Sequence, residues 1–165
     1  MKIPPEVVKL YETRPETFLR SIMGIDSIEE YQKKVIQTIA DNERTAIAAC
    51  HNVGKSWMLA RVVLWFCTVH PGAKVITTAP TYNQVKNILW SEIRTAHASS
   101  KFPLGGVMNL TEWKLSDDHF AIGFTPKNEV TGEVGQGKQS SFQGFHAPYL
   151  LVVFDEATGV MPNIW

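Results

Sequence analysis

The chain has 165 residues, of which 44% are hydrophobic, and it carries 16 Lys or Arg residues against 16 Asp or Glu residues. This length supports one globular domain with a real core and is short for two. The balanced charge gives no general basic field that would attract nucleic acid, so any DNA contact is expected to be local. No apolar stretch reads as an export signal or as a membrane span, and both cysteines lie in apolar runs typical of buried thiols. We therefore expect a cytoplasmic protein without a membrane partner.

The first part of the chain is predicted to be helical. The tetrapeptide Ser27-Ile28-Glu29-Glu30 has the S-x-x-E form of a capping box, which predicts that a helix begins there. Apolar residues then recur at helical spacing as far as Ile39. We therefore divide the chain into an N-terminal helical segment over residues 1–43 and a core over residues 44–165.

Two strand–helix units in succession are predicted after residue 43. Residues 45–50 form a short uncharged run, typical of a strand covered on both faces, and residues 57–69 are apolar almost all round, typical of a buried helix. Residues 74–79 predict a second strand, and Thr81-Tyr82-Asn83-Gln84 is a second capping-box pattern. It begins an amphipathic helix with the apolar stripe Val85, Ile88, Leu89 and Ile93.

The remaining pattern completes the predicted fold class. Residues 113–124 alternate weakly, as in a hairpin, and we expect no helix between residues 101 and 146. Residues 149–154 form an unbroken apolar run that ends in Asp155-Glu156, which predicts a third buried parallel strand. The expected fold is therefore α/β, with a mainly parallel sheet flanked by helices.

A phosphate-binding loop is predicted between the first strand and its helix. The stretch Ala49-Cys50-His51-Asn52-Val53-Gly54-Lys55-Ser56 follows the pattern G-x-x-x-x-G-K-[ST] except at Ala49, which replaces the first glycine. In such a loop the backbone amides surround the phosphates, Lys55 reaches the β and γ oxygens of ATP, and Ser56 binds Mg²⁺. The alternative for a G-K-S triplet is a helix start with a solvated lysine. Its place between a buried strand and a buried helix favours the ATP site.

Two acids are predicted at the same edge of the sheet. Parallel strands end at one edge, so Asp155 is expected near the P-loop, where it would hold Mg²⁺ through water. Glu156 would polarise the attacking water. The alternative is a strand end that simply meets solvent.

Three blocks of this sequence together resemble the large subunit of tailed-bacteriophage terminases. They are A-C-H-N-V-G-K-S-W, T-T-A-P-T-Y-N-Q-V-K-N-I-L-W-S-E-I-R and S-F-Q-G-F-H-A-P-Y-L-L-V-V-F-D-E-A. The resemblance implies a P-loop NTPase of the additional-strand, catalytic-glutamate class, RecA-like, that drives genome DNA into the capsid. It implies catalytic roles for Lys55 and Glu156. Tyr31-Gln32 is similar to the family's adenine-recognising motif, and the alternative is a core-facing tyrosine beside a solvated glutamine.

The same resemblance implies partners and a compartment. The partners are double-stranded phage DNA, the terminase small subunit, the portal protein and further copies of the chain in a ring, all in the bacterial host cytoplasm. Family members continue past the Asp-Glu pair into a coupling motif, further strands and a nuclease domain. We therefore expect an incomplete sheet without the nuclease, from either an excised fragment or a truncated gene product.

One departure from the family pattern leaves undecided which residue supplies the positive charge at the γ-phosphate. Many terminases have an arginine at the position of His51, and a neighbouring subunit's arginine could replace it, with Arg44, Arg61 and Arg94 as candidates. Two other functions also remain open. One is a helicase-like ATPase of the same superfamily, and the other is a nucleotide-binding module without turnover.

Overall fold

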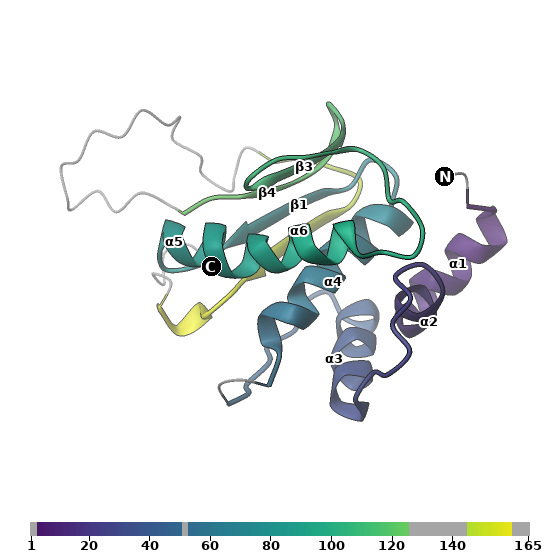
Figure 1. Cartoon of the computed structure of the whole chain (residues 1–165), viewed down its shortest axis with the longest axis horizontal. Helices are drawn as coiled ribbons and strands as arrows, with labels where there is room; N and C mark the ends of the chain where they lie inside the picture. Colours follow the sequence, from purple (N-terminus) through teal and green to yellow (C-terminus); the bar gives the residue numbers. More distant parts are fainter. Residues whose placement is uncertain (1–2, 51–52, 126–144, 160–165) are drawn as a thin grey trace.

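Five strands form one sheet in the computed structural model, which describes residues 3–50, 53–125 and 145–159 (Figure 1). The strands are β1 (Lys74–Thr78), β2 (Val107–Met108), β3 (Glu112–Ser116), β4 (His119–Gly123) and β5 (Leu150–Phe154). The helical elements are α1 (Pro5–Thr13), α2 (Pro15–Ser21), α3 (Glu30–Asp41), α4 (Lys55–Val69), α5 (Tyr82–Gln84), the π-helical segment η1 (Val85–Leu89), α6 (Trp90–Ala98) and the 3₁₀ turn η3 (Ala157–Gly159).

The sheet is mixed, with the strand order β2-β3-β4-β1-β5. The central strand β1 pairs in parallel with β4 and with β5, whereas β3 pairs antiparallel with β2 and β4. The α/β class and the hairpin over residues 113–124 are thus confirmed. The expectation of a mainly parallel sheet is wrong, because the hairpin joins the sheet through β4 rather than forming a separate excursion.

The strand predicted at residues 45–50 is absent from the described chain. Residues 44–50 have no regular structure and are exposed. A strand is stable only when its backbone groups have a partner, and β5 pairs with β1 alone in the part of the sheet that is described. For the same reason β5 is an edge strand here rather than a fully buried one, and Leu150 is 43% exposed.

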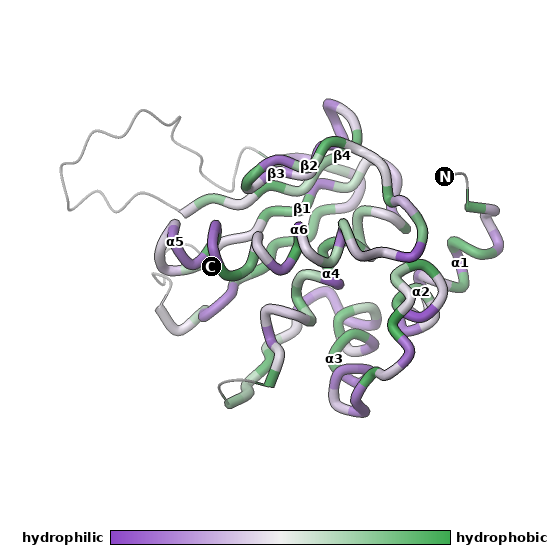
Figure 2. Tube along the Cα trace, viewed as in Figure 1, coloured by the Kyte–Doolittle hydropathy of each residue, from purple (hydrophilic) through white to green (hydrophobic). Residues whose placement is uncertain are grey.

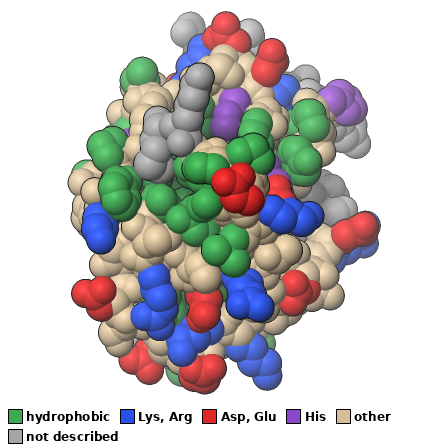
Figure 3. Space-filling view, turned by 90° about the vertical axis from the view of Figure 1, so that its right-hand side faces the viewer, with side chains coloured by type: hydrophobic (Ala, Val, Ile, Leu, Met, Phe, Trp, Pro, Cys, Tyr) green, Lys and Arg blue, Asp and Glu red, His purple; other side chains and the backbone are tan. Residues whose placement is uncertain are grey.

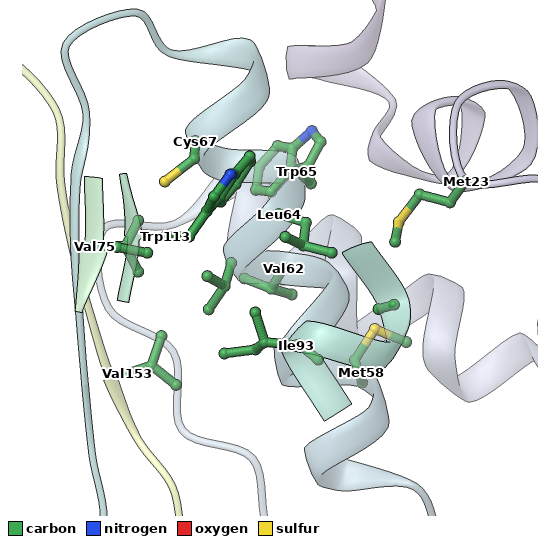
Figure 4. Packing of buried hydrophobic residues seen from close by; sticks show 14 of the residues in the cluster. Met23, Met58, Val62, Leu64, Trp65, Cys67, Val75, Ile93, Trp113 and Val153 are labelled. Carbon is green, nitrogen blue, oxygen red and sulfur yellow. The ribbon is translucent and has the colours of Figure 1, made fainter. Parts of the chain in front are cut away.

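The helices α4 and α6 pack on one face of the sheet (Figure 1). The side chains of Val62 and Ile93 lie between their helices and the strands that carry Val75 and Val153 (Figure 4). The N-terminal helices α1 to α3 pack against α4 from the side away from the sheet. Because α4 is covered on both sides, its sequence is apolar almost all round, as the hydropathy colours of Figure 2 show.

Buried tryptophans connect these layers through their indole N–H groups. Trp65 of α4 donates to the backbone carbonyl of Tyr11 in α1 at 2.8 Å. Trp90 of α6 is fully buried and donates to the Thr77 hydroxyl in β1, also at 2.8 Å. A buried N–H without a partner costs about 1–3 kcal/mol, so these bonds fix the positions of the helices on the sheet.

Two helix starts can be compared with the capping-box predictions. The prediction of a capping box at Ser27 is wrong. Glu29 and Gln32 form the capping box of α3, and Glu30 is its first helical residue. The second prediction is confirmed, since Thr81 and Gln84 form the capping box of α5. In the helix that follows, Ile88 is 48% exposed and does not join the buried stripe as expected. It lies in η1, whose wider turn changes the direction of the side chains relative to an α-helix.

Acidic and basic side chains are interspersed over the face that includes the N-terminal helices, without a large area of one sign in its described part (Figure 3). This distribution agrees with the formal net charge of +0. Among the described helices, none combines the length and the hydropathy that a membrane span requires.

Candidate functional site

The loop before α4 ends at a glycine in the left-handed conformation. Gly54 has φ +82° and is the N-cap residue of α4, and its carbonyl accepts the amide of Met58 at 2.9 Å. Glycine adopts this conformation without the steric penalty that a Cβ brings. The first backbone amides of α4 are therefore directed at the region in front of Lys55 and Ser56, where the helix end favours an anion.

The end of β5 brings a carboxylate to this helix end. The Asp155 amide donates to the Thr78 carbonyl at 2.9 Å, which continues the pairing of β5 with β1 by one residue. The Ser56 hydroxyl then donates to Oδ2 of Asp155 at 3.2 Å, across 99 residues of sequence. Ser56 of the predicted P-loop and Asp155, singled out separately from two motifs, thus lie in direct contact.

The second acid, Glu156, faces Lys55 at the start of α4. Nζ of Lys55 lies 3.9 Å from Oε1 of Glu156, and it also donates to the carbonyls of Ala49 at 3.3 Å and Cys50 at 3.0 Å. The side chains of Lys55 and Glu156 are 23% and 42% exposed, so this ion pair adds little to stability. The ammonium is satisfied by the loop itself, in a place where it could exchange these carbonyls for phosphate oxygens.

The backbone of Glu156 is strained. Its φ is +52°, the one positive φ of a non-glycine residue among the described residues. A side chain in this region costs on the order of 1 kcal/mol, and such outliers cluster at functional sites. This conformation turns the chain sharply after Asp155, so that two consecutive acids face the first residues of α4.

Burial raises the pKa of Asp155 above its ordinary value, and the negative charge of Glu156 adds to this, whereas the hydrogen bond from Ser56 and the charge of Lys55 oppose it. Asp155 is 5% exposed. A carboxyl group whose pKa is raised on folding binds its proton more tightly in the folded state. The contribution of Asp155 to stability is therefore fully present below its ordinary pKa of 3.8 and is lost as the pH rises through the folded pKa. At neutral pH the ionised form is held at a cost, which a cation would offset.

A hollow of about 400 Å³ opens between the acids and the start of α5. Its wall includes Ser56, Pro80, Gln84, Ile88, Asp155, Glu156, Thr158 and Gly159. The turn η3 closes one side of it by packing against Pro80. A Cβ added at Gly159 would lie 2.6 Å from Cγ of Pro80, so a residue larger than glycine would push the turn away.

The helix α3 contacts the loop from the other side. The Tyr31 hydroxyl donates to the carbonyl of Val53, and the Gln32 amide donates to the Tyr31 hydroxyl at 3.3 Å. An added Cβ on Gly54 would be 3.7 Å from Nε2 of Gln32. Tyr31 is 47% exposed, so the alternative of a core-facing tyrosine is wrong. Both residues thus lie beside the loop before α4.

The oxygen ligands at this site suit magnesium bound together with phosphate. In the described parts of the chain, no three His, Cys, Asp or Glu residues are grouped so as to hold a metal on their own. Mg²⁺ typically takes one or two protein oxygens and completes its shell with water and substrate phosphates. Ser56 and Asp155 supply such a partial set, so the residues fit Mg²⁺ that arrives with a nucleotide. His51 and Asn52 of the predicted loop lie outside the described residues.

The three candidate arginines differ in their surroundings. Arg61 is buried at 7% exposure, its guanidinium lies 4.0 Å from the centroid of the Trp57 ring, and it pairs with Glu92 at 3.4 Å. Arg94 donates to the carbonyl of Leu110. Arg44 lies in the exposed segment before the P-loop. Burial therefore excludes Arg61 as a charge offered to a neighbouring subunit.

The sequence as a whole is 32% identical, over 141 residues, to a protein described as a probable terminase large subunit from Enterobacteria phage P7. The match covers 78% of this chain. The chain belongs to the terminase large-subunit family. It spans about a quarter of the length of that relative, 26%. No protein-family model matches the sequence, and no solved structure matches it.

For a terminase large subunit, the site also contains residues that the motif analysis missed. Gln84 and Ile88 line the hollow together with Pro80, and Thr158 and Gly159 close it. The pattern Thr81-Tyr82-Asn83-Gln84 by itself predicts only a helix start, but its position after a predicted parallel strand places it at the same sheet edge as the predicted P-loop. That position was the signal that could have identified Gln84.

Proposed function

We propose that this terminase large-subunit chain is a P-loop NTPase that binds Mg²⁺ and ATP, hydrolyses the ATP, and in the complete protein powers the packaging of phage DNA. The observation that carries the proposal is the contact between the Ser56 hydroxyl and Oδ2 of Asp155. Two motifs 99 residues apart meet with the oxygens that a magnesium nucleotide needs. A chance G-K-S triplet at a helix start would have no reason to face a buried carboxylate.

The roles follow from the position of each group. Lys55 would leave the carbonyls of Ala49 and Cys50 and donate to phosphate oxygens, which bind an ammonium more strongly because they are charged. Ser56 and Asp155 would hold Mg²⁺, which neutralises charge on the phosphates when it is bound. Glu156 is within 3.9 Å of Lys55 and would orient and deprotonate the attacking water.

The other parts of the proposal depend on the family relation. Tyr31 and Gln32 would contact the adenine, because both already lie against the P-loop. Double-stranded phage DNA, the terminase small subunit and the portal protein would be the partners of the complete protein, which would work as a ring of copies in the host cytoplasm. DNA would reach a local surface, since the chain has no net basic charge.

One observation favours a narrower function for this chain alone. Residues 44–50 form no strand and β5 has one partner strand in the described sheet, so the support behind the proposed P-loop is incomplete there. On this alternative the chain binds nucleotide without turnover.

The test compares nucleotide binding with phosphate release, with and without duplex DNA. Saturable magnesium-dependent binding of ATP, with phosphate release that Glu156→Gln removes, supports the ATPase. Binding without phosphate release supports the narrower alternative. No binding at any magnesium concentration would exclude both.

A further inference from the structure

The side-chain amide of Gln84 has a fixed orientation. Its oxygen Oε1 accepts hydrogen bonds from the Thr81 backbone amide at 3.0 Å and from the Thr81 hydroxyl at 2.9 Å. The Gln84 backbone amide in turn donates to the Thr81 hydroxyl at 3.2 Å. A glutamine amide has one acceptor oxygen and one donor nitrogen. Because the oxygen is used by the capping box, the NH₂ group is the polar end that remains for another partner.

Gln84 belongs to the wall of the hollow that contains the acids. Gln84 lines it together with Ser56, Asp155 and Glu156. The carboxylates of Asp155 and Glu156, which follow β5, are acceptors, and Nζ of Lys55 donates hydrogen bonds to loop carbonyls. Gln84 therefore adds a neutral donor to a site that also contains two acids.

The support behind Gln84 is rigid. It is the last residue of α5, and η1 and α6 continue from it without a break. Trp90, at the start of α6, donates a hydrogen bond to Thr77 in the sheet, and Val85 and Leu89 of η1 are fully buried. A donor held by packing in this way does not need to be ordered when a ligand binds.

We infer that Gln84 is a nucleotide-sensing residue, whose NH₂ group donates to the terminal phosphate of bound ATP and so distinguishes ATP from ADP. This inference rests on the proposed nucleotide site. The terminal phosphate is the part of ATP expected beside Glu156, because that is where water would attack. ADP has no oxygen at this position, so it would not contact the amide.

Gln84→Glu tests the donor NH₂ group separately from the helix cap. Glutamate is as suitable as glutamine in a capping box, so its carboxylate can still accept from Thr81 while the NH₂ group is lost. Gln84→Leu removes the donor without adding a charge but also removes the cap. Thr81→Ala weakens the cap and keeps the NH₂ group, which makes it the matched structural control.

The measurement is the affinity of each chain for ATPγS and for ADP, with Mg²⁺, by competition against a fluorescent ADP, together with the melting temperature. We expect both Gln84 variants to lose roughly ten-fold or more in ATPγS affinity, as for a hydrogen bond to a charged group. Their ADP affinity should change less than about two-fold, and Thr81→Ala should keep the preference of the parent chain while its melting temperature falls.

Three results would overturn the inference. The first is an unchanged ratio of ATPγS to ADP affinity in both Gln84 variants, which would leave the nucleotide site itself intact. The second is an equal loss of preference in Thr81→Ala, which would assign the effect to the start of the helix. The third is a parent chain that binds neither nucleotide, which would remove the proposed site and the sensing role together.

Discussion

Among the glycines in the described residues, Gly123 at the end of β4 is predicted to be the one where an added methyl group does most damage to the fold. A Cβ there would lie 2.0 Å from Nε1 and 2.6 Å from Cδ1 of Trp90, and 2.8 Å from Cγ1 of Val85. Trp90 and Val85 are fully buried, so neither can move into solvent. Gly123→Ala must therefore displace Trp90 from the Thr77 hydroxyl, to which its indole donates at 2.8 Å.

Two effects determine the size of the loss. Overpacking a filled core costs typically about 1–3 kcal/mol. A buried indole N–H that loses its acceptor costs a further amount of about 1–3 kcal/mol. We expect the free energy of unfolding to fall by roughly 3 kcal/mol, which for a chain of this size lowers the melting temperature by about 10 °C.

Urea denaturation, followed by tryptophan fluorescence and by circular dichroism, measures this loss. The clash is at the indole, so Trp90→Phe combined with Gly123→Ala should cost less than the sum of the two single substitutions. A denaturation midpoint for Gly123→Ala equal to that of the parent chain would refute the reasoning. Strict additivity in the double substitution would show that the indole is not the obstacle.

The site gives three further predictions. Lys55→Ala should abolish or greatly weaken ATP binding, since water cannot replace an ammonium that faces the phosphates; equal affinity in a fluorescent nucleotide titration would exclude the phosphate site. Glu156→Gln should keep binding and lose hydrolysis, measured by phosphate release, and a collapse of binding would make Glu156 structural or a metal ligand. Asp155→Asn should weaken the magnesium dependence of binding. Because burial raises the pKa of Asp155, the same substitution should raise the melting temperature at neutral pH, with a gain that disappears in acid; a gain independent of pH would contradict this assignment.

Elements with strong local signals were predicted from the sequence. The helix α4 is apolar almost all round, β1 is a short β-branched run, and the Thr81–Gln84 capping box defines a helix start; all three are found. The position of Asp155 near the loop before α4 was also expected, and the structure adds its direct contact with Ser56.

Features that depend on distant partners were not predicted. The run at residues 45–50 has the composition of a strand but no neighbouring strand in the described sheet. Composition alone does not show whether a partner strand is present. A pattern of 3.6 residues per turn does not predict the π-helical turn η1 either. Ile88 was therefore expected in the core, although it lines the hollow. Gln84 was missed because the capping box accounts for its side-chain oxygen and gives no reason to consider its NH₂ group.

The most direct test of the account is a double-mutant cycle on Ser56 and Asp155. Isothermal titration would give the affinity of Mg²⁺ and ATPγS for the parent chain, for Ser56→Ala, for Asp155→Asn and for the double substitution. If the two side chains hold one magnesium ion, each single substitution weakens binding and the double substitution costs clearly less than the sum, with the differences removed by EDTA. Losses that add fully, or binding that is the same in all four chains, would contradict the central claim that these two motifs form one magnesium–nucleotide site.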